Sequence, residues 1–290
     1  MEWLGGLFKM DEFKITTEQI TAFGQMLKEE EHTQSTIQKY LRDVYAFTGW
    51  LEGRAVTREL AAQWKEMLLS SGCAPATVNS KLSAINGFFR FLGREDCKVK
   101  FLKIQRQIFR DRSRELTREE YLRLVQAAKR LGRCRLEMLI ETICATGSRV
   151  SEVQYITVEA AREGRAEISL KGKIRVILLP DKLCKKLLKY AKKQKITSGE
   201  IFITKSGKSL SRRQIWREMK QLCEHAGVEA SKVFPHNLRH LFATAYYRAY
   251  KDIVKLADIL GHSSIETTRI YLVANGEEHA RQLERLGLVC

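Results

Sequence analysis

The chain has 290 residues, 44% of them apolar, and no run of roughly 20 apolar residues that would suit a membrane span. These values exclude a disordered chain and a membrane-spanning helix, and they allow two ordinary domains with separate cores. The net charge of +17 indicates a polyanionic partner, most often a nucleic acid. All of the excess falls in residues 101–290, since residues 1–100 hold 13 basic and 13 acidic side chains.

Seven cysteines occur, an odd number, and no two have the C-x-x-C spacing. This pattern argues against a zinc site and against a disulfide framework. We therefore expect no metal ion, and a reducing, cytoplasmic location.

The first part of the chain is predicted to be helical. Residues 1–15 are expected to be a loose N-terminus rather than a signal peptide, because their short apolar opening lacks a basic segment. Residues 16–94 show helical periodicity and are predicted to form a small helical bundle. The stripe expected on its second helix consists of Ile37, Leu41, Val44, Tyr45, Thr48 and Leu51. Residues 95–115 are basic and poorly periodic, and we interpret them as a linker.

The pattern changes in residues 116–290. A capping box at Thr117 and Glu120 begins a helix, and a second, buried helix follows. Two short β runs, Ala166–Leu170 and Arg175–Leu179, are joined by a turn that contains glycine, and further helices fill the rest. The predicted fold class is therefore mainly α with a small antiparallel β-sheet.

Two motifs in this second part place basic residues in turns. In TGSRVSE, Gly147 ends a helix and Arg149 is expected near the start of the next, where anions bind, with Glu152 close enough to orient it. In LKGKIR, Lys171 and Lys173 flank a hairpin glycine, and either could be a mobile proton donor. An ordinary surface Arg–Glu pair and a solvated turn are the plainer alternatives.

Two later motifs carry histidines and a tyrosine. In PHNLRHLFAT, His236 and Arg239 share a helix face, with His240 one turn on. The neighbouring arginine opposes protonation of His236, which keeps it available as a base. In LGHSSIETTRIYL, His262 follows a helix end and Tyr271 lies near the C-terminal end of the next helix. A turn histidine and a half-buried tyrosine anchor are the alternatives.

Together these motifs hold the groups needed to act on a phosphodiester without a metal ion. Taken in order, TGSRVSE, LKGKIR, HNLRH, LGH and TTRIY resemble the tyrosine recombinase, or phage integrase, family, and in particular its short, Xer-type two-domain members. The resemblance covers about 20–275. It implies a helical core-binding domain at 16–94 and a catalytic domain at 116–290, which together form a C-shaped clamp around double-stranded DNA.

The resemblance also implies roles for single residues. Tyr271 would be the nucleophile that forms a 3′-phosphotyrosine, with Glu152 and His240 in support. Ser148 departs from the family's usual leucine, which we expect the site to tolerate, and Lys171 is preferred to Lys173 as the general acid. The activating residues would be Arg149, Lys171, His236, Arg239 and His262, of which Arg149, Arg239 and His262 would donate to the phosphate oxygens.

The resemblance further implies that neither metal nor ATP is needed and that four protomers assemble on DNA. A tail helix at 276–288 would dock on the neighbouring protomer, or alternatively on its own domain. DNA contacts are expected from Thr77, Asn79, Lys81, Lys173, Arg212, Arg213 and Arg217. Integration or excision of a mobile element, inversion and dimer resolution all fit this architecture. The alternatives are a type IB topoisomerase-like enzyme and a non-catalytic DNA-binding relative.

Overall fold

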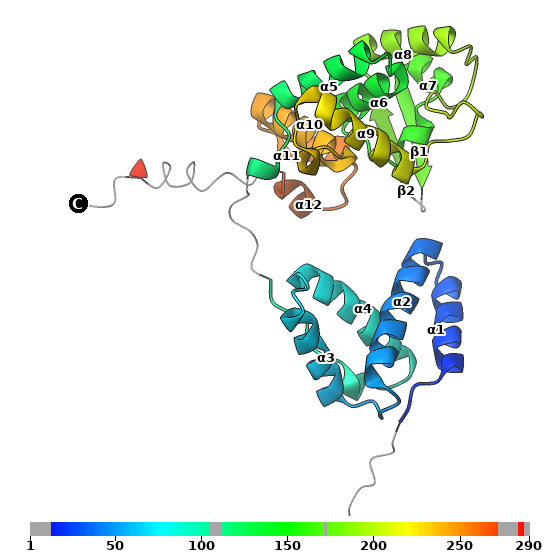
Figure 1. Ribbon diagram of the computed structural model, residues 1–290, viewed down its shortest axis with the longest axis vertical. Helices are drawn as coiled ribbons and strands as arrows, with labels where there is room; N and C mark the ends of the chain where they lie inside the picture. The colour runs from blue at the N-terminus through cyan, green and yellow to red at the C-terminus, as the bar shows by residue number, and fades with distance from the viewer. Residues whose placement is uncertain (1–12, 105–111, 171–172, 272–283, 287–290) are drawn as a thin grey trace, which may run out of the picture. The chain divides into compact units, whose positions relative to one another are not determined.

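The computed structural model describes residues 13–104, 112–170, 173–271 and 284–286, without the side chains of Arg112, Leu170, Lys173 and Ile174. The chain divides into two compact units, Met1–Arg106 and Gln107–Cys290, and each is considered by itself (Figure 1). Within the described residues, no helix is long and apolar enough to cross a membrane.

The first unit is a helical bundle, as predicted. Its helix α2 buries residues in two separate apolar clusters, one with Val44 and Phe88 and one with Phe47 and Phe89. The expected stripe was wrong at one position, because Tyr45 is 49% exposed whereas Phe47 is fully buried. The elements are α1 (Thr17–Glu29), α2 (Gln34–Leu51), α3 (Arg58–Ser70), α4 (Pro75–Phe91) and the 3₁₀ turn η1 (Glu95–Cys97).

The bundle continues beyond its last α-helix. Cys97 and Val99 belong to its core. The buried amide of Asn86 donates to the Val99 carbonyl at 2.9 Å and accepts from the Val99 N–H at 3.1 Å. The division between the units, after Arg106, therefore falls within the segment 95–115 that was interpreted as a linker.

In its described residues the second unit is mostly helical, with a two-stranded sheet, so the predicted fold class is confirmed. Its order is η2 (Arg112–Arg114), α5 (Arg118–Arg130), α6 (Cys134–Thr146), η3 (Val153–Tyr155), α7 (Val158–Glu163), β1 (Arg165–Leu170), β2 (Lys173–Leu178), α8 (Asp181–Lys193), α9 (Arg212–Ala226), η4 (Ala230–Lys232), α10 (Pro235–Tyr250), α11 (Ile253–Leu260) and α12 (Ile265–Arg269). The capping box at Thr117 and Glu120 is present at the start of α5.

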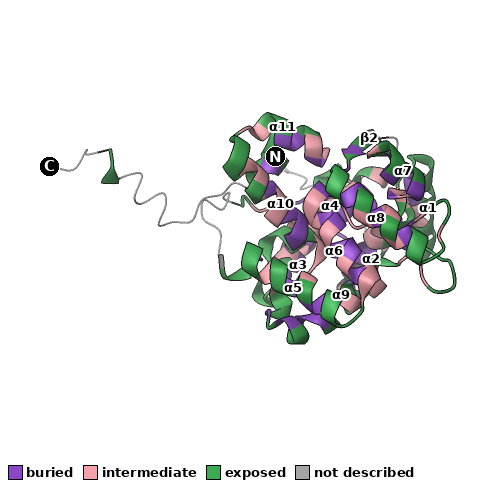
Figure 2. Cartoon of the chain, turned by 90° about the horizontal axis from the view of Figure 1, so that it is seen from above, coloured by how far each residue is buried: buried purple, intermediate pink, exposed green. Residues whose placement is uncertain are grey.

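Helix α6 lies at the centre of this unit and packs against α5, α8 and α10. Leu139, Ile140 and Ile143 are fully buried in its middle. Figure 2 colours the helices by burial. Because α6 is held on several sides, its C-terminal end at Thr146 is a fixed point from which the next loop leaves the core.

The two strands run antiparallel, with Ile168 opposite Arg175 and Ala166 opposite Ile177. Alternate residues of a strand face the same side. Ile177 is buried, and Arg175 lies on the same face, so its side chain is directed into the unit. The hairpin thus brings a guanidinium group to the loop that follows α6.

Candidate active site

The loop after α6 begins with a glycine that no other residue could replace without strain. Gly147 has a φ of +64°, in the left-handed region, and a Cβ added there would lie 2.5 Å from the Phe242 ring and 2.9 Å from Leu260. Its backbone therefore lies directly against α10 and α11. The Gly147 carbonyl uses this closeness to accept a hydrogen bond from Nη1 of Arg239.

Arg149 lies in an irregular turn, which corrects the expectation that it lies near the start of a helix. The next helical element is the 3₁₀ turn η3, which begins only at Val153. Glu152 holds Arg149 in place instead: its carboxylate accepts from the backbone N–H of Arg149 at 2.7 Å and from Nη1 at 2.8 Å. The carboxylate of Glu152, rather than a helix N-terminus, therefore fixes the orientation of Arg149.

The carboxylate of Glu152 is only 3% exposed and serves a second arginine. Nη1 of Arg175, from β2, lies 3.4 Å from Oε1 of Glu152. We did not predict Arg175 from the sequence. The available signal was its place in the strand, two residues before the buried Ile177, where an inward-facing side chain is expected.

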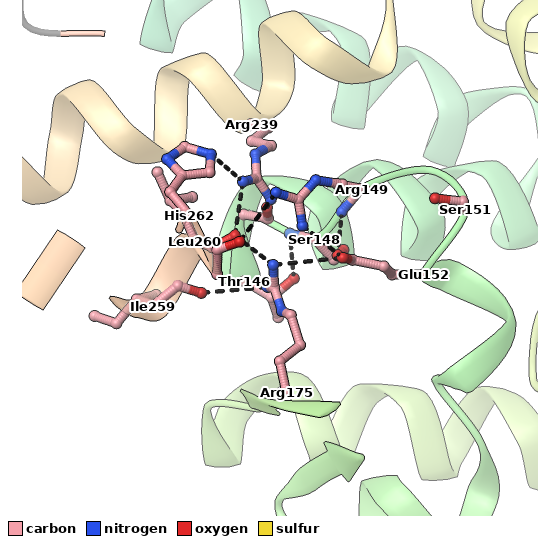
Figure 3. A network of polar contacts seen from close by, with 12 residues as sticks. Thr146, Ser148, Arg149, Ser151, Glu152, Arg175, Arg239, Ile259, Leu260 and His262 are labelled. Atoms are coloured by element: carbon pink, nitrogen blue, oxygen red, sulfur yellow. Dashed lines mark hydrogen bonds and ion pairs between the residues drawn. The ribbon is translucent and has the colours of Figure 1, made fainter. Parts of the chain in front are cut away.

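The C-terminal end of α11 collects three guanidinium groups (Figure 3). Arg175 donates to the carbonyls of Ile259, at 3.2 Å, and of Leu260. Arg239 also donates to the Leu260 carbonyl, at 2.8 Å, and Arg149 donates to the Gly261 carbonyl at 3.3 Å. The last carbonyls of a helix have no partners within it and carry partial negative charge, so they suit cations.

These three arginines leave a surplus of positive charge around one carboxylate. Burial, together with the charges of the nearby Arg239 and Arg149, lowers the pKa of Arg175 to about 10 against the opposing effect of Glu152. Burial also lowers the pKa of Arg239, which is 2% exposed, and Arg149 adds to the shift. A bound anion would relieve this repulsion, and planar guanidinium groups suit a phosphate.

His262 is bound on both sides of its ring. Nη2 of Arg239 lies 2.8 Å from its Nε2, and Oγ1 of Thr268 lies 2.8 Å from its Nδ1. Because a guanidinium group can only donate, Nε2 accepts and the proton is on Nδ1, facing Thr268. Burial, followed by the charge of Arg239, lowers the pKa of His262 to about 4, so the ring is neutral.

Tyr271 lies in the turn after α12, which ends at Arg269. It is 5% exposed, and its ring packs against apolar residues of α10 and α11. Three histidine rings surround it, with centroids at 5.8 Å for His236, 5.3 Å for His240 and 5.8 Å for His262, the last one stacked. The phenol thus lies beside the arginine cluster.

The two histidines of α10 differ in exposure. His236 is exposed, whereas His240 is 4% exposed. Nε2 of His240 lies 3.9 Å from a Glu115 carboxylate oxygen, and its Nδ1 lies 3.4 Å from the Thr244 hydroxyl. The structure therefore brings together seven predicted residues, which are Arg149, Glu152, His236, Arg239, His240, His262 and Tyr271.

Other predicted residues lie elsewhere or outside the described residues. Lys171 falls outside them, as does most of the predicted tail helix 276–288, and of Lys173 only the backbone is described. Among the proposed DNA contacts, Thr77 is exposed, as are Arg212, Arg213 and Arg217 on α9.

Asn79 and Lys81 are occupied inside the first unit. The Asn79 amide exchanges two hydrogen bonds with the backbone of Leu102, at 2.9 and 2.8 Å. The ammonium group of Lys81 lies 3.7 Å from the buried Asp43 carboxylate. Both side chains therefore have structural partners.

No group of three or more histidine, cysteine, aspartate or glutamate residues suited to a metal ion occurs in the described ranges. Family comparison agrees with the site's composition. The model of the phage integrase family matches residues 114–278, and the model of the phage integrase N-terminal SAM-like domain matches residues 20–96.

The chain belongs to the phage integrase family. Among its relatives, tyrosine recombinase XerA of Pyrococcus furiosus is 27% identical over 290 residues, covering 97% of this chain and 98% of the relative. XerC of Roseiflexus castenholzii is 30% identical over 285 residues, covering 90% of each. XerD of Brucella melitensis is 32% identical over 275 residues, covering 85% of this chain and 89% of the relative.

Solved structures show the same phage integrase fold. A lambda integrase tetramer bound to a Holliday junction has a TM-score of 0.72 at 18% identity, covering 90% of this chain and 78% of the other. The XerH site-specific recombinase bound to its difH substrate has a TM-score of 0.66 at 21% identity, covering 84% and 78%.

Proposed function

We propose that this phage integrase family member is a site-specific tyrosine recombinase that cleaves and rejoins double-stranded DNA through a 3′-phosphotyrosine. Relatives that align over nearly the whole chain carry the name tyrosine recombinase. The observation that carries the proposal is Tyr271, a buried phenol beside three histidine rings and a cluster of guanidinium groups.

The first step is attack of the Tyr271 oxygen on the scissile phosphorus. A P–O bond to tyrosine forms, the P–O5′ bond breaks, and the 5′-oxygen leaves as a hydroxyl. His236 takes the phenolic proton, and Lys171 supplies the proton for the leaving oxygen. A 5′-hydroxyl from a partner duplex then attacks the phosphotyrosine. A new phosphodiester forms, and Tyr271 leaves with its phenolic proton restored.

The arginines stabilise the charge that develops on the phosphate oxygens. Arg149 and Arg239 are held by backbone carbonyls and Glu152, so they need little reorganisation when a phosphate binds. Preorganised donors of this kind are each worth about 3–4 kcal/mol. Because the phosphotyrosine keeps the phosphodiester energy, the reaction needs no ATP. The guanidinium groups supply the charge stabilisation that a metal ion would otherwise give.

His262 requires a change of state before it can act as a donor. In the DNA-free protein its Nε2 accepts from Arg239. When a phosphate binds beside Arg239, its negative charge favours a protonated His262, whose Nε2–H can then donate to the phosphate. The expected role of His262 as a donor therefore belongs to the bound complex.

Strand exchange between two duplexes requires several protomers. The lambda integrase structure is a tetramer on a Holliday junction, and we propose the same assembly here, with the tail 276–288 on a neighbouring protomer. Since the substrate is chromosomal or mobile DNA, the proposed place of action is the nucleoid in the cytoplasm.

The test uses a nicked duplex that carries the recombination site, from which the cleaved fragment diffuses away so that the intermediate accumulates. Wild type should give a covalent protein–DNA band on a denaturing gel, and Tyr271→Phe should give none. Tyr250→Phe, which changes a tyrosine that is 69% exposed, is the matched control and should behave as wild type. A wild-type protein that binds the site without forming the band would overturn the proposal.

Supplying an intact partner duplex distinguishes recombination from nicking and closing. A recombinase transfers the strand only when a second site is present. Relaxation of supercoils by a protein that never yields recombinant strands would favour a topoisomerase-like enzyme.

A further inference from the structure

We propose that Arg175 is a positioning residue that locks the C-terminal end of α11 to the loop after α6, and so fixes the spacing of the groups that activate the phosphate. This inference rests on the proposed function for its meaning in catalysis. Arg175 is placed to do so because one guanidinium group reaches the carbonyls of Ile259 and Leu260 together with the carboxylate of Glu152 (Figure 3).

Arg175 joins segments that are far apart in the sequence. Its backbone belongs to β2, its carboxylate partner follows α6, and its carbonyl partners end α11. Each of these partners also holds an activating arginine: Glu152 binds Arg149, and the Leu260 carbonyl binds Arg239. A displacement of Arg175 is therefore transmitted to both.

The same helix end also places His262. The His262 N–H donates to the Ala257 carbonyl at 3.0 Å, and the Gly261 N–H donates to the Asp258 carbonyl at 2.9 Å. These bonds close the last turn of α11, whose outer carbonyls Arg175 neutralises. The side chain of Arg175 is 13% exposed, so the guanidinium group itself is mostly withdrawn from solvent.

The Arg175 side chain leaves no room for a residue other than glycine at position 261. A Cβ on Gly261 would lie 2.6 Å from Nη1 of Arg175 and 2.7 Å from its Cδ. Gly261 also has a φ of +62°, which disfavours other residues. The close fit of Gly261 and Arg175 explains why a glycine lies directly before His262.

The test compares Arg175→Met, Arg175→Lys and the matched control Arg165→Met, which removes an exposed arginine from the partner strand of the same hairpin. Single-turnover formation of the covalent adduct is measured with protein saturating the nicked duplex, and DNA affinity is measured separately. We expect Arg175→Met to bind DNA within about 3-fold of wild type but to cleave about 100-fold more slowly, the cost of a small misplacement of catalytic groups. Arg175→Lys, which keeps the charge, should recover part of the rate, and Arg165→Met should cleave as wild type.

A double-mutant cycle separates positioning from general support of the fold. Because Arg175 acts on Arg149 through Glu152, Arg175→Met should cost less in a Glu152→Gln background than in the wild type. Additive rate losses at an unchanged melting temperature would overturn the proposal. If Arg175→Met does not fold, Arg175→Lys decides: a folded but slowed protein supports the proposal, and wild-type cleavage overturns it.

A further readout does not depend on catalysis. Hydrogen exchange at the Gly261 and His262 amides should speed up in the Arg175 variants and not in Arg165→Met, because the last turn of α11 loses its neutralising partner. Unchanged exchange would overturn the proposal even if DNA cleavage is observed. Conversely, faster exchange in a protein whose wild type forms no adduct would leave Arg175 as the structural lock and reject the proposed function.

Discussion

Replacing Glu152 with glutamine removes the carboxylate that pairs with Arg149 and Arg175 while keeping the shape of the side chain. The wild-type carboxylate accepts from the Arg149 backbone at 2.7 Å and from its guanidinium group at 2.8 Å, and lies 3.4 Å from Arg175. Removing one partner of a buried ion pair typically costs about 3–5 kcal/mol. The side chain of Arg149 is 40% exposed, so water can solvate part of its charge once the carboxylate is gone. We therefore expect Glu152→Gln to lower the free energy of unfolding by about 3 kcal/mol.

The assay is urea denaturation with and without inorganic phosphate. Unfolding is monitored by hydrogen exchange in peptides of the second unit, so that unfolding of the first unit does not contribute to the signal. Glu163→Gln, which changes an exposed partner of Arg165, is the matched control and should unfold as wild type. Phosphate should stabilise Glu152→Gln more than wild type, since three guanidinium groups then lack an anion. A loss below about 1 kcal/mol, or equal phosphate effects in both proteins, would refute this electrostatic reasoning.

Three further predictions concern other residues. The hydroxyl of Ser148 is buried and has no hydrogen-bond partner among the described residues, so Ser148→Ala should raise the free energy of unfolding by about 1 kcal/mol and leave cleavage unchanged; a destabilised variant would contradict this. Between pH 6.5 and 4 the unfolded chain takes up a proton at His262 that the folded protein refuses, so stability falls as the pH falls, and His262→Asn should weaken this dependence in denaturation curves. Arg213→Ala on α9 should lower the salt slope of DNA binding by about 1, while Arg162→Ala, also exposed, leaves it unchanged; equal slopes would remove Arg213 from the DNA contacts.

The helices were predictable because their apolar residues recur with helical spacing. The error on α2 has a physical reason: this helix packs in two clusters, with Val44 in one and Phe47 in the other. It therefore buries a wider face than the single stripe that the spacing suggested, and the stripe included Tyr45 at the edge of that face.

The candidate site was predictable where the chemistry lies in the side chains. Arg149, Arg239, His262 and Tyr271 were found from short motifs whose order matches a known family. Arg175 was missed because its partners are mainly backbone carbonyls at a helix end. Every residue has a backbone carbonyl, so the sequence does not indicate which ones accept a hydrogen bond.

Hydrogen-bond partners that are distant in the sequence could not be predicted either. Asn79 looked like a polar residue available to DNA, but its amide is bound to the backbone of Leu102, 23 residues later. Only the folded chain reveals such a pairing, because the return of the segment after α4 is set by the packing of Cys97 and Val99 in the core.

The proposed reaction requires a covalent bond between Tyr271 and DNA. Mass spectrometry of the trypsin-digested and nuclease-digested adduct tests it most directly, since cleavage after Arg269 and Arg281 gives a peptide in which Tyr271 is the one tyrosine. We expect a nucleotide on this peptide, joined through its 3′-phosphate to the tyrosine oxygen. A nucleotide on any other residue, or joined through a 5′-phosphate, would contradict it.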